Sequence, residues 1–148
     1  MEKLTICIPG EPIRTTEQQH RFGGIGRNGK AIIYRDAKLS AARQTLIASL
    51  LPHRPVKHME GPVLLQVEWR FGTTDKTKLK QRWKTTRPDT DNMIKLLKDC
   101  MTETGFWKDD AQIVQESLAK SWTTPERAET VIIVTEISAG LKDDASWT

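Results

Sequence analysis

The chain has 148 residues, of which 37% are hydrophobic and 28% charged, enough for one domain that buries about 70% of its unfolded surface. No run of more than four consecutive apolar residues occurs, which excludes a membrane span and a secretory signal and predicts a cytoplasmic protein. Cys7, Cys100 and the three scattered histidines lack zinc-ligand spacing, which argues against a zinc site or a disulfide scaffold.

The charges are unevenly distributed along the chain. The net charge is +4, yet residues 76–87 hold six basic residues and no acid, whereas residues 89–148 hold six basic and twelve acidic residues. A concentrated basic segment favours binding to a polyanion such as nucleic acid. We therefore expect a functional site where the basic segment meets the acidic one.

The N-terminal third predicts a strand and a loop. Residues 4–8 alternate and end at Pro9, which is typical of a strand. Residues 15–30 are polar and glycine-rich, which predicts a loop or a loose hairpin. Residues 24–29 match G-x-G-x-x-G, but strand-like residues 31–34 follow where a dinucleotide site needs a helix. The glycines therefore indicate a turn.

Two helices and a strand are predicted in the middle of the chain. Apolar residues recur at helical spacing over residues 36–51, and Pro52 ends this pattern. Residues 63–71 alternate as a strand, and the polar, basic residues 73–86 predict a loop or mobile arm. Trp83 in this arm is either a core anchor or a wedge that stacks on bases. A second helix begins between residues 89 and 92 and ends at Gly105.

The C-terminal third predicts two more strands, at residues 111–122 and 129–137, and a tail that frays from about residue 140. Strands outnumber helices, and neighbouring strands can pair as hairpins. The sequence therefore predicts an α+β fold, namely a single two-layer domain over residues 1–148 with a mixed β-sheet and two main helices.

Two carboxylates, Asp89 and Asp91, stand at the predicted start of the second helix. Unpaired N–H groups and the helix dipole favour their ionised forms, which a hard divalent cation needs. Either aspartate alone could be an N-cap, but one cap does not require two carboxylates. A calcium loop is excluded because Met93 and Ile94 occupy the positions of a ligand and an essential glycine.

Lys95 lies four residues after Asp91, and Asp99 lies four residues further. This spacing fits an ordinary ladder of ion pairs along one helix face. It fits equally a cation that contacts a phosphate beside a metal site and stabilises charge in the transition state. The spacing alone leaves both interpretations open.

A second acidic pair, Asp109 and Asp110, follows Phe106 and Trp107 beyond the end of this helix. One interpretation is a charged turn that the two aromatic residues anchor in the core. However, the partial negative charge of the helix C-terminus repels adjacent carboxylates. A cation shared with the carboxylates at residues 89 and 91 would relieve this repulsion and suit Mg²⁺ or Mn²⁺.

The acidic motifs resemble those of one known family. Residues 87–99 read Arg-Pro-Asp-x-Asp-Asn-x-x-Lys-x-x-x-Asp, and residues 105–114 read Gly-Phe-Trp-x-Asp-Asp-Ala-Gln-Ile-Val. This combination closely resembles the RusA family of Holliday junction resolvases, which is found in bacteria and often in prophages. The resemblance implies a RusA-like fold and a homodimeric, Mg²⁺-dependent endonuclease, with Mn²⁺ able to substitute. Pro88 departs from the pattern, because some members have a basic residue there.

The resemblance also implies roles for individual residues. By motif position, Asp89, Asp91 and Asp110 are the catalytic metal ligands, Asp109 is a further candidate ligand, and Lys95 is catalytic beside the scissile phosphate. Water activated by the metal would attack phosphorus in line and leave a 5′-phosphate and a 3′-hydroxyl. The resemblance does not transfer contacts to DNA residue by residue. From their charge alone, the basic residues of the loop and the arm are candidate contacts to the DNA backbone, with an ordinary solvated surface as the alternative: Arg14, Arg21, Arg27, Lys30, Lys76, Lys78, Lys80, Arg82, Lys84 and Arg87.

The function expected from these motifs is resolution of four-way DNA junctions by paired symmetric nicks, in recombination and repair. Two symmetric nicks need two active sites related by a two-fold axis, so a homodimer is expected. Two alternatives remain. One is a non-catalytic protein that binds branched DNA with the same basic surface, and the other is a metal-dependent nuclease that cuts forks or flaps.

Overall fold

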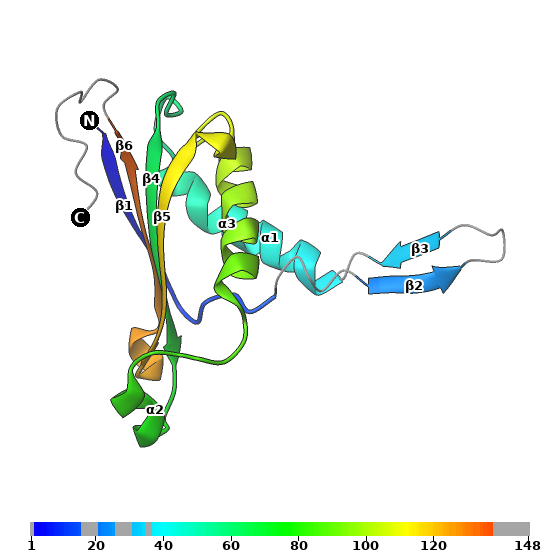
Figure 1. Cartoon of the computed structure of the whole chain (residues 1–148), viewed down its shortest axis with the longest axis vertical. Helices are drawn as coiled ribbons and strands as arrows, with labels where there is room; N and C mark the ends of the chain where they lie inside the picture. The colour runs from blue at the N-terminus through cyan, green and yellow to red at the C-terminus, as the bar shows by residue number, and fades with distance from the viewer. Residues whose placement is uncertain (1, 16–20, 26–30, 35–36, 138–148) are drawn as a thin grey trace.

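The computed structural model describes residues 2–15, 21–25, 31–34 and 37–137 (Figure 1). Its strands are β1 (Lys3–Pro9), β2 (Arg21–Ile25), β3 (Ala31–Tyr34), β4 (Val63–Gly72), β5 (Ile113–Thr123) and β6 (Glu129–Glu136). Its helices are α1 (Ala37–Leu50), α2 (Lys76–Gln81) and α3 (Thr90–Thr104), with short 3₁₀ turns η2 (Leu51–His53), η3 (Asp110–Gln112) and η4 (Pro125–Arg127).

Four strands form one mixed sheet in the order β1-β6-β4-β5. β6 pairs antiparallel with β1 and with β4, whereas β4 and β5 run parallel. The predicted α+β fold with a mixed sheet is confirmed. The expectation that neighbouring strands pair as hairpins is wrong for β5 and β6, because β4 lies between them. A parallel β4–β5 pair needs a crossover connection, which α3 supplies.

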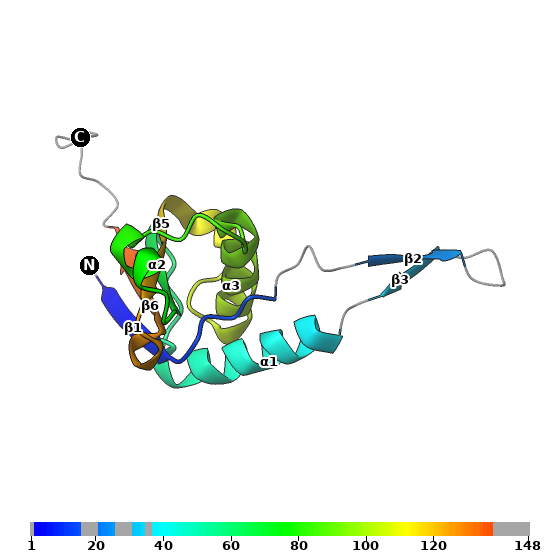
Figure 2. The same ribbon diagram turned by 90° about the horizontal axis from the view of Figure 1, so that it is seen from below.

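Helices α1 and α3 cover one face of this sheet (Figures 1 and 2). Every second residue of β4 and β6 is buried on that face, as the alternation in their sequences requires. The helices contribute apolar stripes at helical spacing, so the core lies between the two layers. Its buried apolar strand residues are Ile6, Val63, Leu65, Val67, Trp69, Phe71, Ile132 and Val134.

The end of α3 agrees with the prediction. Gly105 adopts a left-handed conformation with φ 92°, and its N–H donates to the carbonyls of Met101 and Thr102, each at 3.2 Å. Phe106 and Trp107 follow and are fully buried. The Trp107 indole N–H donates to Thr102 Oγ1 at 2.7 Å. The two aromatic residues therefore anchor the turn that leads to η3, as the sequence suggested.

The predicted loop at residues 73–86 is partly wrong, because α2 forms inside it. The Asp75 carboxylate caps this helix by accepting from the backbone N–H groups of Thr77 at 2.8 Å and Lys78 at 3.3 Å. Arg82, with φ 66°, ends the helix. The helix has no buried residue of its own, so the apolar periodicity that reveals longer helices is absent.

The N-terminal hairpin consists of β2 and β3, which pair antiparallel and project beyond the start of α1 (Figure 2). The G-x-G-x-x-G sequence begins in β2, and the next described element is the strand β3 rather than the helix that a dinucleotide site needs. Residues 26–30, on which the predicted turn falls, lie outside the described residues. Arg27, Lys30 and the tail from residue 140 lie outside the described residues. No helix in the described ranges is long and apolar enough to cross a membrane.

Candidate active site

Asp89 and Asp91 stand exposed at the start of α3. Asp89 occupies the N-cap position, but its carboxylate makes no capping hydrogen bond. The Asp91 carboxylate accepts one hydrogen bond, from the backbone N–H of Asn92 at 3.0 Å. Helix capping therefore does not account for the Asp89 side chain. Both carboxylates keep oxygen atoms that could bind a cation.

Lys95 lies one turn further along α3 and is exposed. Within the described part of the chain its ammonium has no ion-pair partner, and neither does Asp91. The ion-pair ladder proposed from the spacing is thus absent between these two residues. The Lys95 ammonium is accordingly available to an external anion beside the two carboxylates.

The two residues of the second acidic pair differ in their contacts, since the Asp109 carboxylate caps a 3₁₀ turn and the Asp110 carboxylate does not. Asp109 caps η3, because its carboxylate accepts from the Ala111 N–H at 2.9 Å. The Gln112 side-chain oxygen completes the capping box by accepting from the N–H groups of Lys108 at 2.9 Å and Asp109 at 3.0 Å. The exposed Asp110 carboxylate has no partner among the described residues.

Gln112 is a residue whose role the sequence reasoning missed. Its side-chain amide also donates to the carbonyls of Met59 at 2.8 Å and Gly61 at 3.0 Å. It therefore ties the acidic turn to the segment that precedes β4. The D-x-x-Q spacing from Asp109 to Gln112 was the signal that could have revealed this capping box.

A single copy of the chain does not bring Asp110 to Asp89 and Asp91. Asp110 lines a surface hollow with Asp99, Thr102 and Glu103, residues of the C-terminal half of α3. A helix of 15 residues at about 1.5 Å per residue separates its two ends by about 20 Å. In the described ranges no three His, Cys, Asp or Glu side chains gather as a metal site. Among the described residues of one chain, the three predicted aspartates therefore do not meet in one site.

Two lysines hold the segment that leads into Asp89. Lys84 is only 4% exposed, and its ammonium donates to Thr86 Oγ1 at 2.6 Å, to the Thr86 carbonyl at 3.3 Å and to the Arg87 carbonyl at 2.5 Å. Lys120 on β5 donates to the carbonyls of Thr86 and Pro88, both at 2.8 Å. Lys84 was predicted to contact DNA, but its ammonium is directed at the protein's own backbone. The sequence patterns assigned no role to Lys120.

Cations gather around two aromatic rings at this end of the sheet. The Lys84 ammonium lies 5.2 Å from the ring centre of Phe71 and 4.7 Å from that of Trp122. The Arg14 guanidinium lies over Phe71 at 4.8 Å, and the Lys78 ammonium over Trp122 at 4.9 Å. These distances fit cation–π contacts, which hold the cations close together despite their mutual repulsion.

The environment of Lys84 changes its acidity. Burial, followed by the positive charges of its neighbours, lowers the pKa of the Lys84 ammonium to about 8. The neighbouring cations are Arg14, Lys120 and Lys78, in order of decreasing effect. The Glu11 carboxylate acts in the opposite direction. Lys84 is therefore a buried cation held among other cations.

The other basic residues of the arm lie at the surface. Trp83 is 48% exposed and lies against the Arg82 guanidinium, 4.4 Å from ring centre to Cζ, so its interpretation as a core anchor is wrong. Arg14 is exposed and pairs with Glu11 at 3.0 Å. The remaining exposed basic residues of the segment are Lys76, Lys78, Lys80 and Arg87. The arm thus presents a positive surface at the end of the sheet where β4 and β5 finish (Figure 1).

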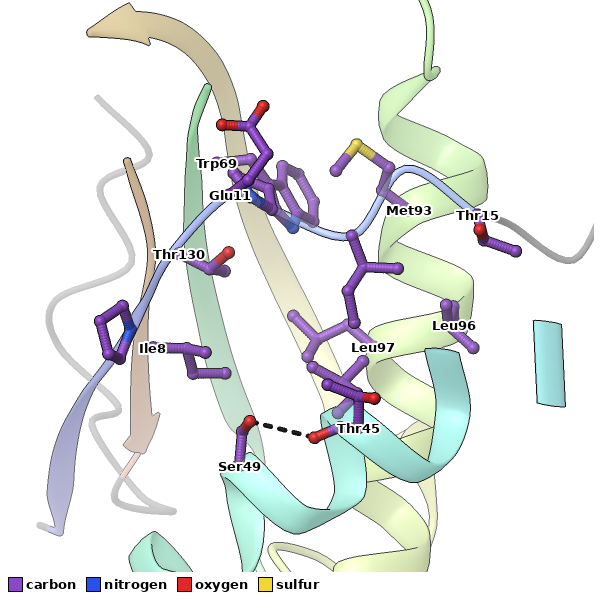
Figure 3. Close-up of a pocket in the computed structure, with 14 residues that line it drawn as sticks. Ile8, Glu11, Thr15, Thr45, Ser49, Trp69, Met93, Leu96, Leu97 and Thr130 are labelled. Atoms are coloured by element: carbon purple, nitrogen blue, oxygen red, sulfur yellow. Dashed lines mark hydrogen bonds between the residues drawn. The ribbon is translucent and has the colours of Figure 1, made fainter. Parts of the chain in front are cut away.

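A cavity of about 110 Å³ lies elsewhere, between the chain after β1, helices α1 and α3, and the sheet (Figure 3). Met93, Leu97 and Trp69 supply much of its apolar wall. Ser49, which also lines it, donates its hydroxyl proton to the Thr45 carbonyl at 3.0 Å. No predicted site residue lines the cavity, which is a gap in the helix–sheet packing.

Comparison with known proteins agrees with the motifs. The family model described as "Endodeoxyribonuclease RusA" matches residues 9–134. The "Crossover junction endodeoxyribonuclease rusA" of Lactococcus phage r1t is 33% identical over 124 residues, which cover 83% of this chain and 90% of that protein. "Uncharacterized protein YqaN" of Bacillus subtilis (strain 168) is 30% identical over 149 residues, 94% of this chain and 100% of that protein. The resemblance seen in the motifs is therefore confirmed, and the chain belongs to the RusA family of endodeoxyribonucleases, the Holliday junction resolvases.

Proposed function

We propose that this protein resolves four-way DNA junctions by paired symmetric nicks, in DNA recombination and repair, with Mg²⁺ as its cofactor. The observation that carries the proposal is the exposed pair of carboxylates at the start of α3, Asp89 and Asp91, close in sequence to an exposed basic helix. Asp89 makes no capping hydrogen bond, and Asp91 accepts only one, from the Asn92 N–H. Oxygen ligands of this kind suit Mg²⁺, with Mn²⁺ as a substitute. The phage relative also makes a bacterial or prophage origin part of the proposal.

The residues have distinct roles in this proposal. Asp89, Asp91 and Asp110 hold the divalent cation, which supplies charge neutralisation at phosphorus and activation of the attacking water. Lys95 lies on the same helix as the first two aspartates and places its ammonium against a non-bridging oxygen of the scissile phosphate. Asp109 shapes the turn that carries Asp110 through its bond to the Ala111 N–H.

A homodimer completes the ligand set. Within one copy, α3 keeps Asp110 away from Asp89 and Asp91. An isologous dimer in which α3 of one copy runs antiparallel to α3 of the other would bring the C-terminal end of each helix beside the N-terminal end of its partner. Each active site would then combine two carboxylates of one chain with the third carboxylate of the other. Two such sites also match the two symmetric nicks.

The basic arm binds the phosphate backbone of the junction. Lys76, Lys78, Lys80, Arg82 and Arg87 are exposed, and α2, which precedes Asp89 in the chain, lies at the end of the sheet where β4 and β5 finish. Positive charge at this place attracts the DNA strand toward the carboxylates and offsets their repulsion of phosphate. Arg14 extends the same surface from the segment after β1. Arg21, Arg27 and Lys30 remain proposed contacts from the hairpin region.

The test is cleavage of matched substrates by the purified protein. A synthetic four-way junction, a fork, a flap and a linear duplex that share arm sequences are incubated with Mg²⁺, Mn²⁺ or EDTA. We expect paired nicks in opposite strands of the junction, with 5′-phosphate ends that ligase reseals, and no cleavage in EDTA. Junction binding without nicks would favour the non-catalytic alternative. Faster cleavage of the fork or flap would favour the nuclease for those structures.

A further inference from the structure

The segment from residue 85 to residue 88 joins the basic arm to Asp89, yet its backbone is not part of any sheet or helix. Among the described residues, no backbone-to-backbone hydrogen bond holds these four residues. Regular hydrogen bonding begins only at the Met93 N–H, which donates to the Asp89 carbonyl at 3.1 Å. Other groups must therefore fix the backbone just before Asp89.

The groups that do so are two ammonium ions. Lys84 and Lys120 together donate four hydrogen bonds to the carbonyls of Thr86, Arg87 and Pro88, and a fifth from Lys84 reaches Thr86 Oγ1. All three consecutive carbonyls are thus occupied. Hydrogen bonds from a charged donor are about twice as strong as those between neutral groups.

Both lysines are themselves held by the body of the protein. Lys120 belongs to β5, which pairs along its length with β4. The Lys84 N–H donates to the Lys120 carbonyl at 3.0 Å, and its side chain packs against the rings of Phe71 and Trp122. The ammonium groups are therefore fixed relative to the sheet. Through their hydrogen bonds to the carbonyls of residues 86–88, they fix the backbone that precedes Asp89.

We propose that Lys84 and Lys120 are positioning residues for the nuclease reaction, because they fix residues 86–88 and thereby place the Asp89 carboxylate and the first turn of α3. The inference rests on the proposed role of Asp89 as a metal ligand. A misplacement of about 1 Å in a catalytic group can cost about 100-fold in rate. Lys84 and Lys120 thus act on the proposed metal site through the backbone of residues 86–88, whereas the exposed arm residues are the proposed DNA contacts.

The test compares Lys120→Met with Lys120→Arg and with a matched control, Lys98→Met. Lys98 also forms a bond between α3 and β5, to Glu116 at 2.6 Å, but it does not contact residues 86–88. Nicking of DNA is measured across a Mg²⁺ titration, and DNA affinity is measured separately in Ca²⁺. We expect Lys120→Met to lower nicking by about tenfold or more and to raise the Mg²⁺ concentration at half-maximal rate. DNA affinity should change by less than about threefold, since an ammonium bound to backbone carbonyls neutralises no phosphate.

Arginine at position 120 keeps the charge and can donate to two carbonyls, so it should restore most of the activity. Lys98→Met should behave as the unchanged protein. Lys84→Met is a second variant in which thermal unfolding is followed alongside, since its side chain is buried. A Lys120→Met variant with unchanged nicking and an unchanged Mg²⁺ titration would overturn the proposal, and so would a loss of DNA affinity equal to the loss of nicking.

A readout independent of cleavage separates this inference from the proposed function. Amide hydrogen exchange at Met93 reports the first turn of α3, because its N–H bonds to the Asp89 carbonyl. Exchange at Met93 should accelerate by about tenfold in Lys120→Met while exchange at Leu97 stays unchanged, since loosening confined to one turn leaves the next protected. If the protein cuts forks rather than junctions, the variants are compared on forks. Equal exchange at Met93 in both proteins would refute the positioning role whatever the substrate.

Discussion

Four aspartates flank α3, and their hydrogen bonds separate them into two kinds. Asp109 is engaged in the capping box of η3, whereas Asp89 and Asp110 make no side-chain hydrogen bond to the described residues and Asp91 makes one. A carboxylate used for capping has fewer free lone pairs for a cation. This difference supports the proposed role of Asp110, rather than Asp109, as a metal ligand.

Replacing Asp91 by asparagine is the first prediction at this scale. The change removes an anionic group from the proposed metal site, so cleavage should fall by about 100-fold or more. Junction affinity should be retained or increased, because a negative charge near the phosphates is lost. Gel-shift and cleavage assays on the same preparation measure the two effects. Glu60→Gln is the matched control, since it removes an exposed carboxylate on a surface loop, and an equal loss of binding and cleavage in Asp91→Asn would contradict the assignment.

The second prediction concerns Lys84 and pH. Its pKa of about 8 in the folded protein lies below its ordinary value of 10.5, so the unfolded chain binds more protons between these values. The contribution of Lys84 to stability should therefore increase as pH rises from about 8 to about 10.5, by at most about 3 kcal/mol. The charges that face it are those of Arg14, Lys78, Lys120 and Glu11.

Urea unfolding at several pH values between 7 and 10.5 measures this effect. Subtracting the free energy of unfolding of Lys84→Met removes the titration of groups common to both proteins. The difference between the two proteins should shift in favour of the unchanged chain as pH rises. A difference that is constant with pH would mean that burial and the neighbouring cations do not perturb this lysine.

At the scale of single elements, α2 is a helix that apolar periodicity in the sequence does not predict. Six residues with alternating lysines carry no apolar stripe, so periodicity predicted a loop. The helix depends instead on the Asp75 cap and on the contact of Lys78 with Trp122, a residue more than forty positions later. A short helix is marginal by itself in water, and tertiary contacts decide whether it forms.

The helix also supports a prediction about DNA binding. Replacing Lys76 and Lys80 by glutamine preserves helix propensity and removes two exposed charges. Junction affinity should fall, and the slope of log K against log salt should decrease by about two, one for each lost phosphate contact. A matched double variant, Lys3→Gln with Lys57→Gln, removes two exposed charges outside the arm and should leave the slope unchanged. An unchanged slope in the α2 variant would exclude these two lysines from the DNA interface.

At the scale of the whole molecule, the crossover between β4 and β5 determines where the acidic residues lie. The parallel pairing requires α3 to run back along the sheet before β5 begins. Asp89 and Asp91 therefore lie at the start of the helix, whereas Asp110 lies beside residues of its C-terminal half such as Thr102 and Glu103. The same connection that builds the fold prevents one chain from closing a three-aspartate site.

Mixing two inactive variants tests whether the site is shared between copies. In a mixed dimer of Asp91→Asn and Asp110→Asn, a shared arrangement leaves one site with all of its aspartates and one site with both substitutions. Partial unfolding and refolding of the mixture lets the chains exchange partners, and random pairing makes up to about half of the dimers mixed. Each mixed dimer should then nick one strand of the junction. Each variant refolded alone is the control. No restored nicking in a mixture shown to contain mixed dimers would place all three ligands in one chain.

The sequence by itself determined the family, the main elements and the identity of the acidic residues. Strand alternation, helical spacing and Gly105 at the helix end depend on near neighbours in the chain, so residues 63–71 and the helix that follows Asp89 were predicted close to their observed bounds. The two acidic motifs are likewise local patterns. Such elements can be predicted locally because side chains on one face recur every two residues in a strand and every 3.6 residues in a helix, so the apolar residues follow the same spacing.

Only the tertiary structure decided which of these residues meet. It placed β4 between β5 and β6, buried Lys84 against Phe71 and Trp122, and held Asp110 apart from Asp89 by the length of α3. Contacts of this kind join residues that are distant in sequence, and no local pattern encodes them. The role of the basic arm changed for the same reason, since one of its lysines faces backbone carbonyls inside the protein while the others face solvent.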